Sequence, residues 1–247
     1  MSKNPSPRSG ASRLISAKNG QPSETGTVVA NYSDTPSCDL GQPRHALKGT
    51  WGGARNRADK VSEYLSDEHV KRLTDAAAVA FADGHIFQRH WTVHYGLAGI
   101  DPSDGARFVG KLIDLVKKQA RREGGEAYAI WVRECASGKG EHVHILLCLP
   151  AGMSLRNRTR RWIVAAGGTY RAGVSKVTPI GGRIARKPQG IRTRINAENV
   201  LRYFLKAVKA ETGEQLGLPR SGEGGRIVGK RCGFTFNLRK FGTALAG

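Results

Sequence analysis

The sequence lacks the features of several protein classes. Its four cysteines, at positions 38, 135, 148 and 232, form no CxxC pair, so neither a zinc–cysteine cluster nor a disulfide framework is expected. No apolar run approaches the roughly 20 residues that a membrane-spanning helix needs, and the first ten residues lack the apolar segment of a secretion signal. These absences predict a reduced protein of the cytoplasm that makes no membrane contact.

Negative charge is scarce in the second part of the chain. Residues 151–247 contain 20 Lys and Arg, four Glu and no Asp, so that +16 of the formal net charge of +20 lies there. This segregation predicts a surface for phosphate groups and hence a nucleic-acid partner. A solubility feature or a basic tail would have the same composition.

Composition and periodicity predict three regions. Residues 1–50 are rich in Ser, Gly, Pro and Asn and are expected to form a disordered arm. A domain over 51–211 follows, with a helical lead-in over 51–84, and residues 212–247 form a basic, Gly-rich C-terminal tail. Within the domain we expect helices at 66–82, from 104, at 155–166 and from Asn196 to about 210. We expect strands at 91–95, 127–134 and 142–149, and one or two more over 174–195. This order predicts an α+β fold, an antiparallel sheet with helices packed mainly on one face.

The most informative segment is a predicted β-hairpin over 131–150. Side chains alternate between faces along a strand, so His142, His144 and Leu146 point to one face while Val143, Ile145 and Leu147 point to the other. The two imidazoles are about 7 Å apart along the strand and can converge on one cation. Glu134, on the preceding strand, and Glu141, beside His142, compete as a third ligand. Alternation turns Glu141 away unless the hairpin turn contains a bulge.

Two histidines and one carboxylate suit Mn²⁺ or Mg²⁺ acting on a phosphate, and such a set can also hold Zn²⁺ or Fe²⁺. Because HxH is a short pattern, the alternative is a pair of half-exposed strand histidines beside a surface glutamate.

A second pair of polar residues lies on the predicted helix from Asn196. Tyr203 and Lys206 are three positions apart, hence side by side at the edge of an apolar stripe. A tyrosine phenol, whose reference pKa is about 10, attacks phosphorus only where cations favour its phenolate form. A metal on the histidine pair and the Lys206 ammonium would supply these cations. The alternative is an amphipathic edge with a snorkelling lysine.

In these two motifs, HVH at 142–144 and YFLK at 203–206, the chain resembles the HUH endonuclease superfamily in its replication-initiator (Rep-like) branch. The strand near 91–96 corresponds loosely to that family's first motif, and the resemblance spans roughly residues 85–210. It implies an RRM-like sheet in which His142, His144 and Glu134 bind Mn²⁺ or Mg²⁺, Tyr203 is the nucleophile and Lys206 assists it. No second tyrosine follows at the spacing of paired-tyrosine members, which implies a single-tyrosine enzyme.

The resemblance implies an endonuclease that nicks single-stranded DNA or an origin hairpin through a 5′-phosphotyrosine link and starts rolling-circle replication of a plasmid or phage-like element. The sequence has no GxxxxGK[ST] phosphate loop, so a host helicase would unwind the DNA, and a host polymerase would extend the free 3′ end. Three alternatives remain: a transposase or mobilisation relaxase with the same chemistry, a non-enzymatic single-stranded nucleic-acid-binding protein, and a metal-dependent hydrolase without a covalent step.

Overall fold

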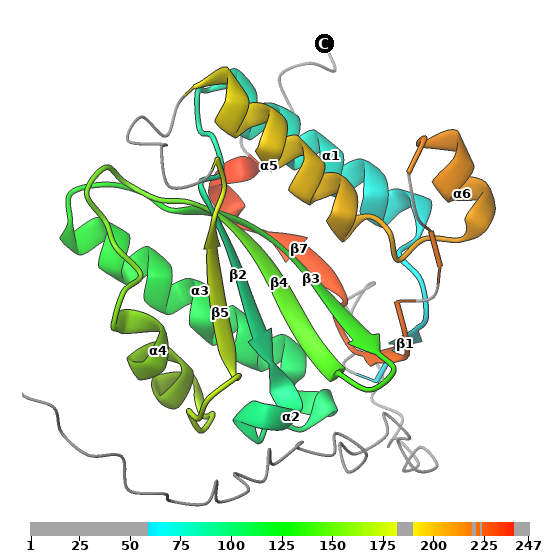
Figure 1. The fold of residues 1–247 in the computed structure, drawn as a ribbon, viewed down its shortest axis with the longest axis horizontal. Helices are drawn as coiled ribbons and strands as arrows, with labels where there is room; N and C mark the ends of the chain where they lie inside the picture. The colour runs from blue at the N-terminus through cyan, green and yellow to red at the C-terminus, as the bar shows by residue number, and fades with distance from the viewer. Residues whose placement is uncertain (1–58, 182–189, 219–220, 223, 240–247) are drawn as a thin grey trace, which may run out of the picture. The chain divides into compact units, whose positions relative to one another are not determined.

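The computed structural model describes residues 59–181, 190–218, 221–222 and 224–239, and these form a mixed α+β fold (Figure 1). The arm predicted over 1–50 and the end of the predicted C-terminal tail lie outside the described residues. None of the described helices has the length and apolar character needed to cross a bilayer. In chain order the elements are β1 (Val61–Ser62), α1 (Asp67–Ala82), β2 (Arg89–His94), α2 (Tyr95–Ala98), η2 (Pro102–Asp104), α3 (Gly105–Arg122), β3 (Tyr128–Ala136), β4 (Gly140–Cys148), α4 (Arg158–Ala166), β5 (Ser175–Pro179), α5 (Ile191–Phe204), α6 (Ala210–Gln215), β6 (Ile227–Val228), β7 (Cys232–Phe234) and η3 (Phe236–Leu238).

The centre of the fold is a five-stranded antiparallel sheet with the strand order β5-β2-β4-β3-β7, and β1 pairs with β6 in a separate small sheet. The predicted hairpin is confirmed as β3 and β4. Its register places Glu134 opposite His142, while on the other side of β4 the residue opposite His144 is Thr92 of β2. Cross-strand partners share a face of the sheet, so the polar residues of three neighbouring strands gather on one face.

Helices cover both faces of this sheet, so the expectation that they pack mainly on one face is wrong. On one face, α3 and α4 pack against Val143 and Ile145 of β4. On the other, α1 and α5 pack against Ile130, Val132 and Leu146 (Figure 1). The physical reason is that β3 and β4 carry apolar residues on both faces, and a strand of that kind is stable only when both faces are covered.

Helix α5 begins and ends earlier than the sequence predicts. The sequence predicts a helix from Asn196 to about 210, but α5 begins at Ile191 after Gly190 and ends at Phe204. Its buried stripe starts with Thr193, a polar residue that hides the helical periodicity of this turn. Residues 205–209 form a turn that leads into the separate short helix α6.

Part of the predicted basic tail belongs to the fold, because β7 pairs with β3 as an edge strand of the main sheet. The fully buried guanidinium of Arg133 fixes this segment: it donates to the carbonyl oxygens of Val228 and Lys230, to that of Pro102, and to the buried carboxylate of Glu141. A buried arginine needs such a full set of acceptors to offset the loss of its hydration.

Candidate active site

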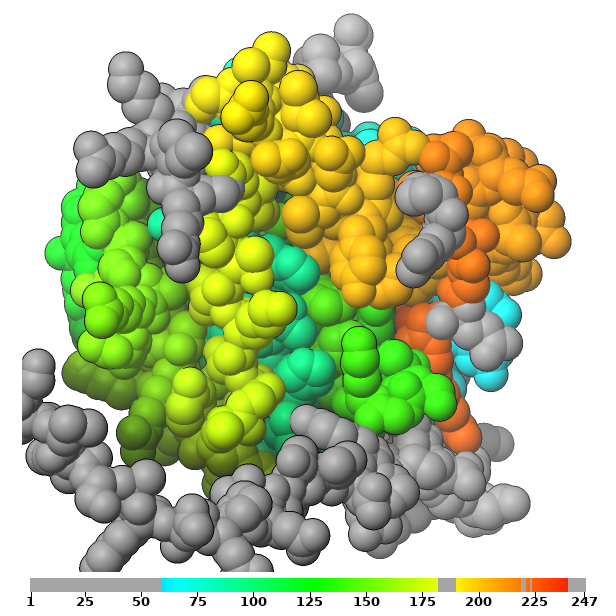
Figure 2. All heavy atoms as spheres, in the orientation of Figure 1, coloured from blue at the N-terminus to red at the C-terminus, as the bar shows by residue number. Residues whose placement is uncertain are grey.

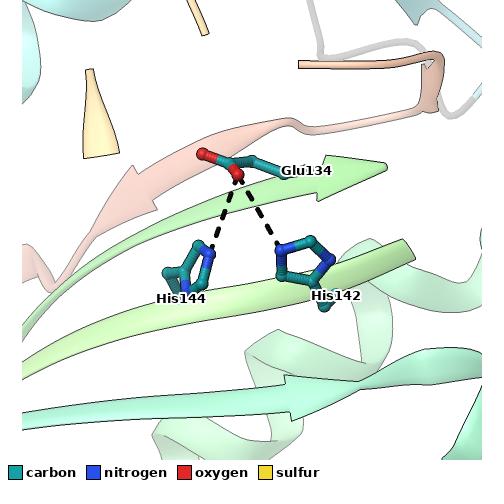
Figure 3. Close-up of side chains that lie close together, drawn as sticks. All are labelled: Glu134, His142 and His144. Carbon is teal, nitrogen blue, oxygen red and sulfur yellow. Dashed lines mark ion pairs between the residues drawn. The ribbon is translucent and has the colours of Figure 1, made fainter. Parts of the chain in front are cut away.

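Three potential metal ligands meet on the hairpin. Glu134, His142 and His144 are each at most 5% exposed, and their ligand atoms all lie within 4.8 Å of one another. Nε2 of His142 is 3.8 Å and Nε2 of His144 is 3.7 Å from the same carboxylate atom, Oε2 of Glu134 (Figure 3). The alternative of half-exposed histidines beside a surface glutamate is therefore wrong.

Hydrogen bonds at the far nitrogen of each imidazole orient the ring. Nδ1 of His142 lies 3.1 Å from the Gly140 carbonyl oxygen, to which it can only donate, so the neutral ring keeps its lone pair on Nε2. Nδ1 of His144 contacts Oγ1 of Thr92 and Nε2 of His90, both at 3.1 Å. Both Nε2 atoms thus face the carboxylate, as in metal sites where a second hydrogen bond fixes the ligating tautomer.

Burial and neighbouring charges set the protonation of the cluster. Burial lowers the pKa of His142 to about 4, and the neighbouring His144 acts in the same direction. Burial alone would raise the pKa of the Glu134 carboxyl, but His144 and the Lys206 ammonium outweigh it and hold this pKa at about 2. At neutral pH the site therefore offers a neutral His142 imidazole and an ionised carboxylate, which are the forms that bind metals.

The last turn of α5 brings Tyr203 to this cluster. Phe204 is fully buried, and its ring centroid lies 5.3 Å from that of His90 and 5.5 Å from that of His144. Because Phe204 anchors the helix end over the imidazoles, the preceding residue lies at the rim of the site. The Tyr203 ring is edge-on to His144 at a centroid distance of 5.5 Å, and the residue is 47% exposed.

Lys206 lies just after α5, in a turn fixed by the backbone. Its N–H donates to the Tyr203 carbonyl oxygen, and its own carbonyl oxygen accepts from the Gly222 N–H at 3.0 Å. The side-chain Nζ reaches Oε2 of Glu134 at 2.5 Å and lies 3.9 Å from the centroid of the Tyr203 ring. The ammonium thus connects the phenol ring with the carboxylate that faces both histidines.

All five residues predicted for the site come together, whereas Glu141, the competing carboxylate, does not join them. Glu141 points to the opposite face of the sheet, as side-chain alternation predicts, and accepts a hydrogen bond from Nε of Arg133 at 2.7 Å.

Sequence reasoning did not assign the β2 residues that border the site. His90 and Thr92 contact His144, and the ring centroid of His94 lies 5.3 Å from that of His142. The signal was present in the sequence, because these three polar residues alternate along one strand and therefore share one face.

The site face is accessible beside α5. Figure 2 shows β2 as an uncovered strip between β5 and the hairpin, below α5. Thr92 and His94 on this strip are partly exposed, and Lys176, opposite Thr92 on β5, is exposed. A polyanionic strand can therefore approach the Tyr203 ring along a face that carries polar and basic groups.

The candidate site therefore consists of a phenol, an ammonium and three buried potential metal ligands. Comparison of the chain with protein-family models, with curated proteins and with solved structures finds no significant match.

Proposed function

We propose that the protein is a metal-dependent single-stranded DNA endonuclease and strand transferase of the HUH type, which nicks DNA through a covalent link to Tyr203. The observation that carries the proposal is the placement of Tyr203 and Lys206 over the donor cluster. The Tyr203 ring is 5.5 Å from that of His144, and Nζ of Lys206 is 2.5 Å from Glu134.

The chemistry of the donor set fits a divalent cation. Oε1 of Glu134 and Nε2 of His144 are buried without a hydrogen-bond partner, a costly state that a bound cation would relieve. Neighbouring ligands of an octahedral Mg²⁺ are about 3 Å apart, so the observed distances of 3.7 and 3.8 Å require small side-chain movements. When bound, Mn²⁺ or Mg²⁺ supplies positive charge that polarises a phosphodiester.

The residues of the chain would then divide the reaction among them. The phenol of Tyr203 loses its proton to solvent, and its oxygen attacks phosphorus in line. Its bond to phosphorus forms as the bond from phosphorus to O3′ breaks, and the 3′ oxygen takes up a proton from solvent. Lys206 favours the loss of the phenol proton and offsets charge on the phosphoryl oxygens. The phosphotyrosine conserves the energy of the broken bond, so a 3′ hydroxyl can reverse the step and rejoin the strand without ATP.

A labelling experiment tests this function. The full chain is incubated with Mn²⁺ and single-stranded oligonucleotides of randomised sequence that carry the label at the 3′ end, and the products are separated on a denaturing gel. We expect label attached to the protein, because a 5′-phosphotyrosine retains the downstream fragment. The same oligonucleotides labelled at the 5′ end should release only free, shortened strands.

Tyr203→Phe should remove the covalent product and leave DNA affinity unchanged. Tyr170→Phe is the matched control, because Tyr170 is another exposed tyrosine, 39% accessible. Nicking that survives in Tyr203→Phe would instead identify a hydrolase without a covalent step. Binding without any nicking by the wild type would identify a non-enzymatic binding protein. A defined cleavage site would separate a replication initiator from a transposase or a relaxase.

A further inference from the structure

A second basic surface lies away from the donor cluster, where α1 meets β7 and η3. A pocket of about 40 Å³ opens there, and its lining includes Arg72, Lys230, Phe234 and Arg239. At roughly 10–15 Å³ for each enclosed water, this is room for about three oxygen-sized groups. None of the five proposed active-site residues lines it.

Two of the three cations of this pocket lack a counter-charge among the described residues, and the third has only a long ion pair. Among the described residues, no carboxylate lies within ion-pair distance of Lys230 or Arg239, and Arg72 reaches Glu68 only at 3.9 Å. Burial lowers the pKa of Lys230, and the nearby Arg239 and Arg72 lower it further. Three like charges around one small pocket are stabilised by a bound anion.

The position of Lys230 is built into the fold. Its Nζ lies 5.4 Å from the centroid of the Trp131 ring. This approach requires Gly233, because a Cβ there would come within 3.0 Å of the Lys230 side chain and 2.9 Å of Trp131. The Lys230 ammonium therefore lies against Trp131 and Gly233 at the mouth of this pocket.

An aromatic platform continues from this pocket. The guanidinium of Arg239 lies 5.8 Å from the ring centroids of both Phe234 and Phe236, and Phe236 is 62% exposed. Phe236 also lines a neighbouring cavity of about 190 Å³, together with Lys117 and Arg121 of α3.

Asn237, which lines the larger cavity, carries an unpaired acceptor. The side-chain amide of Asn237 donates to Oε2 of Glu126 at 3.1 Å, which orients the group, and its Oδ1 is buried without a hydrogen-bond partner. An exposed ring beside an unpaired carbonyl oxygen suits a flat ligand that carries an amine, such as a nucleobase.

We propose that Arg72, Lys230, Phe236, Asn237 and Arg239, together the η3 surface, bind a nucleotide unit of single-stranded DNA. The phosphate enters the small pocket, and the adjoining base stacks on Phe236. The base reaches Oδ1 of Asn237, which is buried in the free protein, once that side-chain amide turns toward the cavity. This proposal and the proposed function have in common only the class of ligand, single-stranded DNA. The η3 surface binds the DNA whether or not Tyr203 cuts the strand. The protein would then have a second binding site for the strand, away from the nucleophile.

Fluorescence anisotropy with a labelled 20-nucleotide single strand tests the η3 surface across a KCl series. Lys230→Met keeps the packing on Trp131, and Arg239→Gln changes an exposed residue. Each should weaken binding and reduce the slope of log K against log salt by about 0.7 for each phosphate that the variant no longer neutralises. Phe236→Leu should weaken binding about tenfold with the slope unchanged. Lys71→Gln removes an exposed lysine of α1 that is paired with Asp75 at 2.7 Å, and serves as the control.

Binding by all three variants that matches Lys71→Gln overturns the proposal. A second result would also overturn it: inorganic phosphate displaces the strand as effectively as deoxyadenosine monophosphate does, and Phe236→Leu binds normally. The pocket would then be a site for free phosphate rather than for a nucleotide. At saturating DNA, the η3 variants should still form the Tyr203 adduct. Tyr203→Phe should lose the adduct while its affinity and salt slope stay unchanged. If the wild type forms no adduct but the η3 variants weaken binding, only the proposed function fails. If the adduct forms but the η3 variants bind like Lys71→Gln, only the η3 surface fails.

Discussion

Addition of Mn²⁺ to the protein without DNA should stabilise the fold, because the donor cluster exists only when β3 and β4 are paired. A ligand at 100 times its Kd that binds only the folded state adds about 2.7 kcal/mol to the free energy of unfolding. For a folded region of this size, each kcal/mol of added stability raises the Tm by about 2–4 °C. The expected increase in Tm is therefore about 5–11 °C. Differential scanning calorimetry at pH 7.5 measures it.

Two substitutions assign this shift to the cluster. Glu134→Gln keeps the shape of the side chain but removes the charged ligand, so most of the Mn²⁺ shift should disappear. Lys206→Met leaves Glu134 buried without the ammonium that lies 2.5 Å away. Breaking a buried ion pair costs about 3–5 kcal/mol. The cost here should be smaller, about 2 kcal/mol, because the Lys206 side chain is 29% exposed and partly solvated.

Lys206→Met should therefore melt at a lower temperature without metal and show a larger Mn²⁺ shift than the wild type, since the divalent cation replaces the missing positive charge beside Glu134. Lys71→Met, which removes a lysine that is 76% exposed, is the control and should behave like the wild type. An equal Mn²⁺ shift in Glu134→Gln and in the wild type would refute the assignment of the ligands. A smaller shift in Lys206→Met than in the wild type would refute the electrostatic reasoning.

Further predictions concern the stability of the fold. Burial lowers the pKa values of His90 and His142 to about 4, so between pH 6.5 and 4 the unfolded chain binds protons that the folded chain does not. These two histidines should therefore make the free energy of unfolding rise with pH across this window, by at most about 2.7 kcal/mol per pH unit between them. The Glu141 carboxyl, whose pKa burial raises to about 7, partly offsets this rise, and a flat profile in urea denaturation would contradict the prediction. Arg133→Met should lower the free energy of unfolding by about 3–5 kcal/mol, because it leaves Glu141 buried and unpaired. Arg133→Met combined with Glu141→Leu should recover part of that loss in the same urea assay, and a double variant less stable than the single one would contradict the ion-pair explanation.

The donor cluster could be predicted because it depends on local rules. Strand alternation separates His142 and His144 from Val143, Ile145 and Leu147 of β4, and a hairpin register places Glu134 opposite His142. The same rule turned Glu141 to the other face, where its partner is Arg133. No long-range information was needed, since all three donors lie on one supersecondary unit.

The errors arose where tertiary contacts decide the structure. Helix α5 starts at Ile191 because Thr193 is buried against the rest of the fold, although its hydroxyl interrupts the apolar pattern. Coverage of both faces was signalled by the long apolar runs of β3 and β4. The inclusion of β7 in the sheet had no clear signal, because three residues are too few for a periodicity.

The donors and the nucleophile occupy separate parts of the chain. Glu134, His142 and His144 fall within one hairpin, whereas Tyr203 and Lys206 come from the end of a helix that follows β5. During synthesis the hairpin therefore leaves the ribosome well before α5. Under the proposed chemistry, a product that ends before α5 lacks both Tyr203 and the helix that covers the donor side of the sheet, so it has no means to cut DNA.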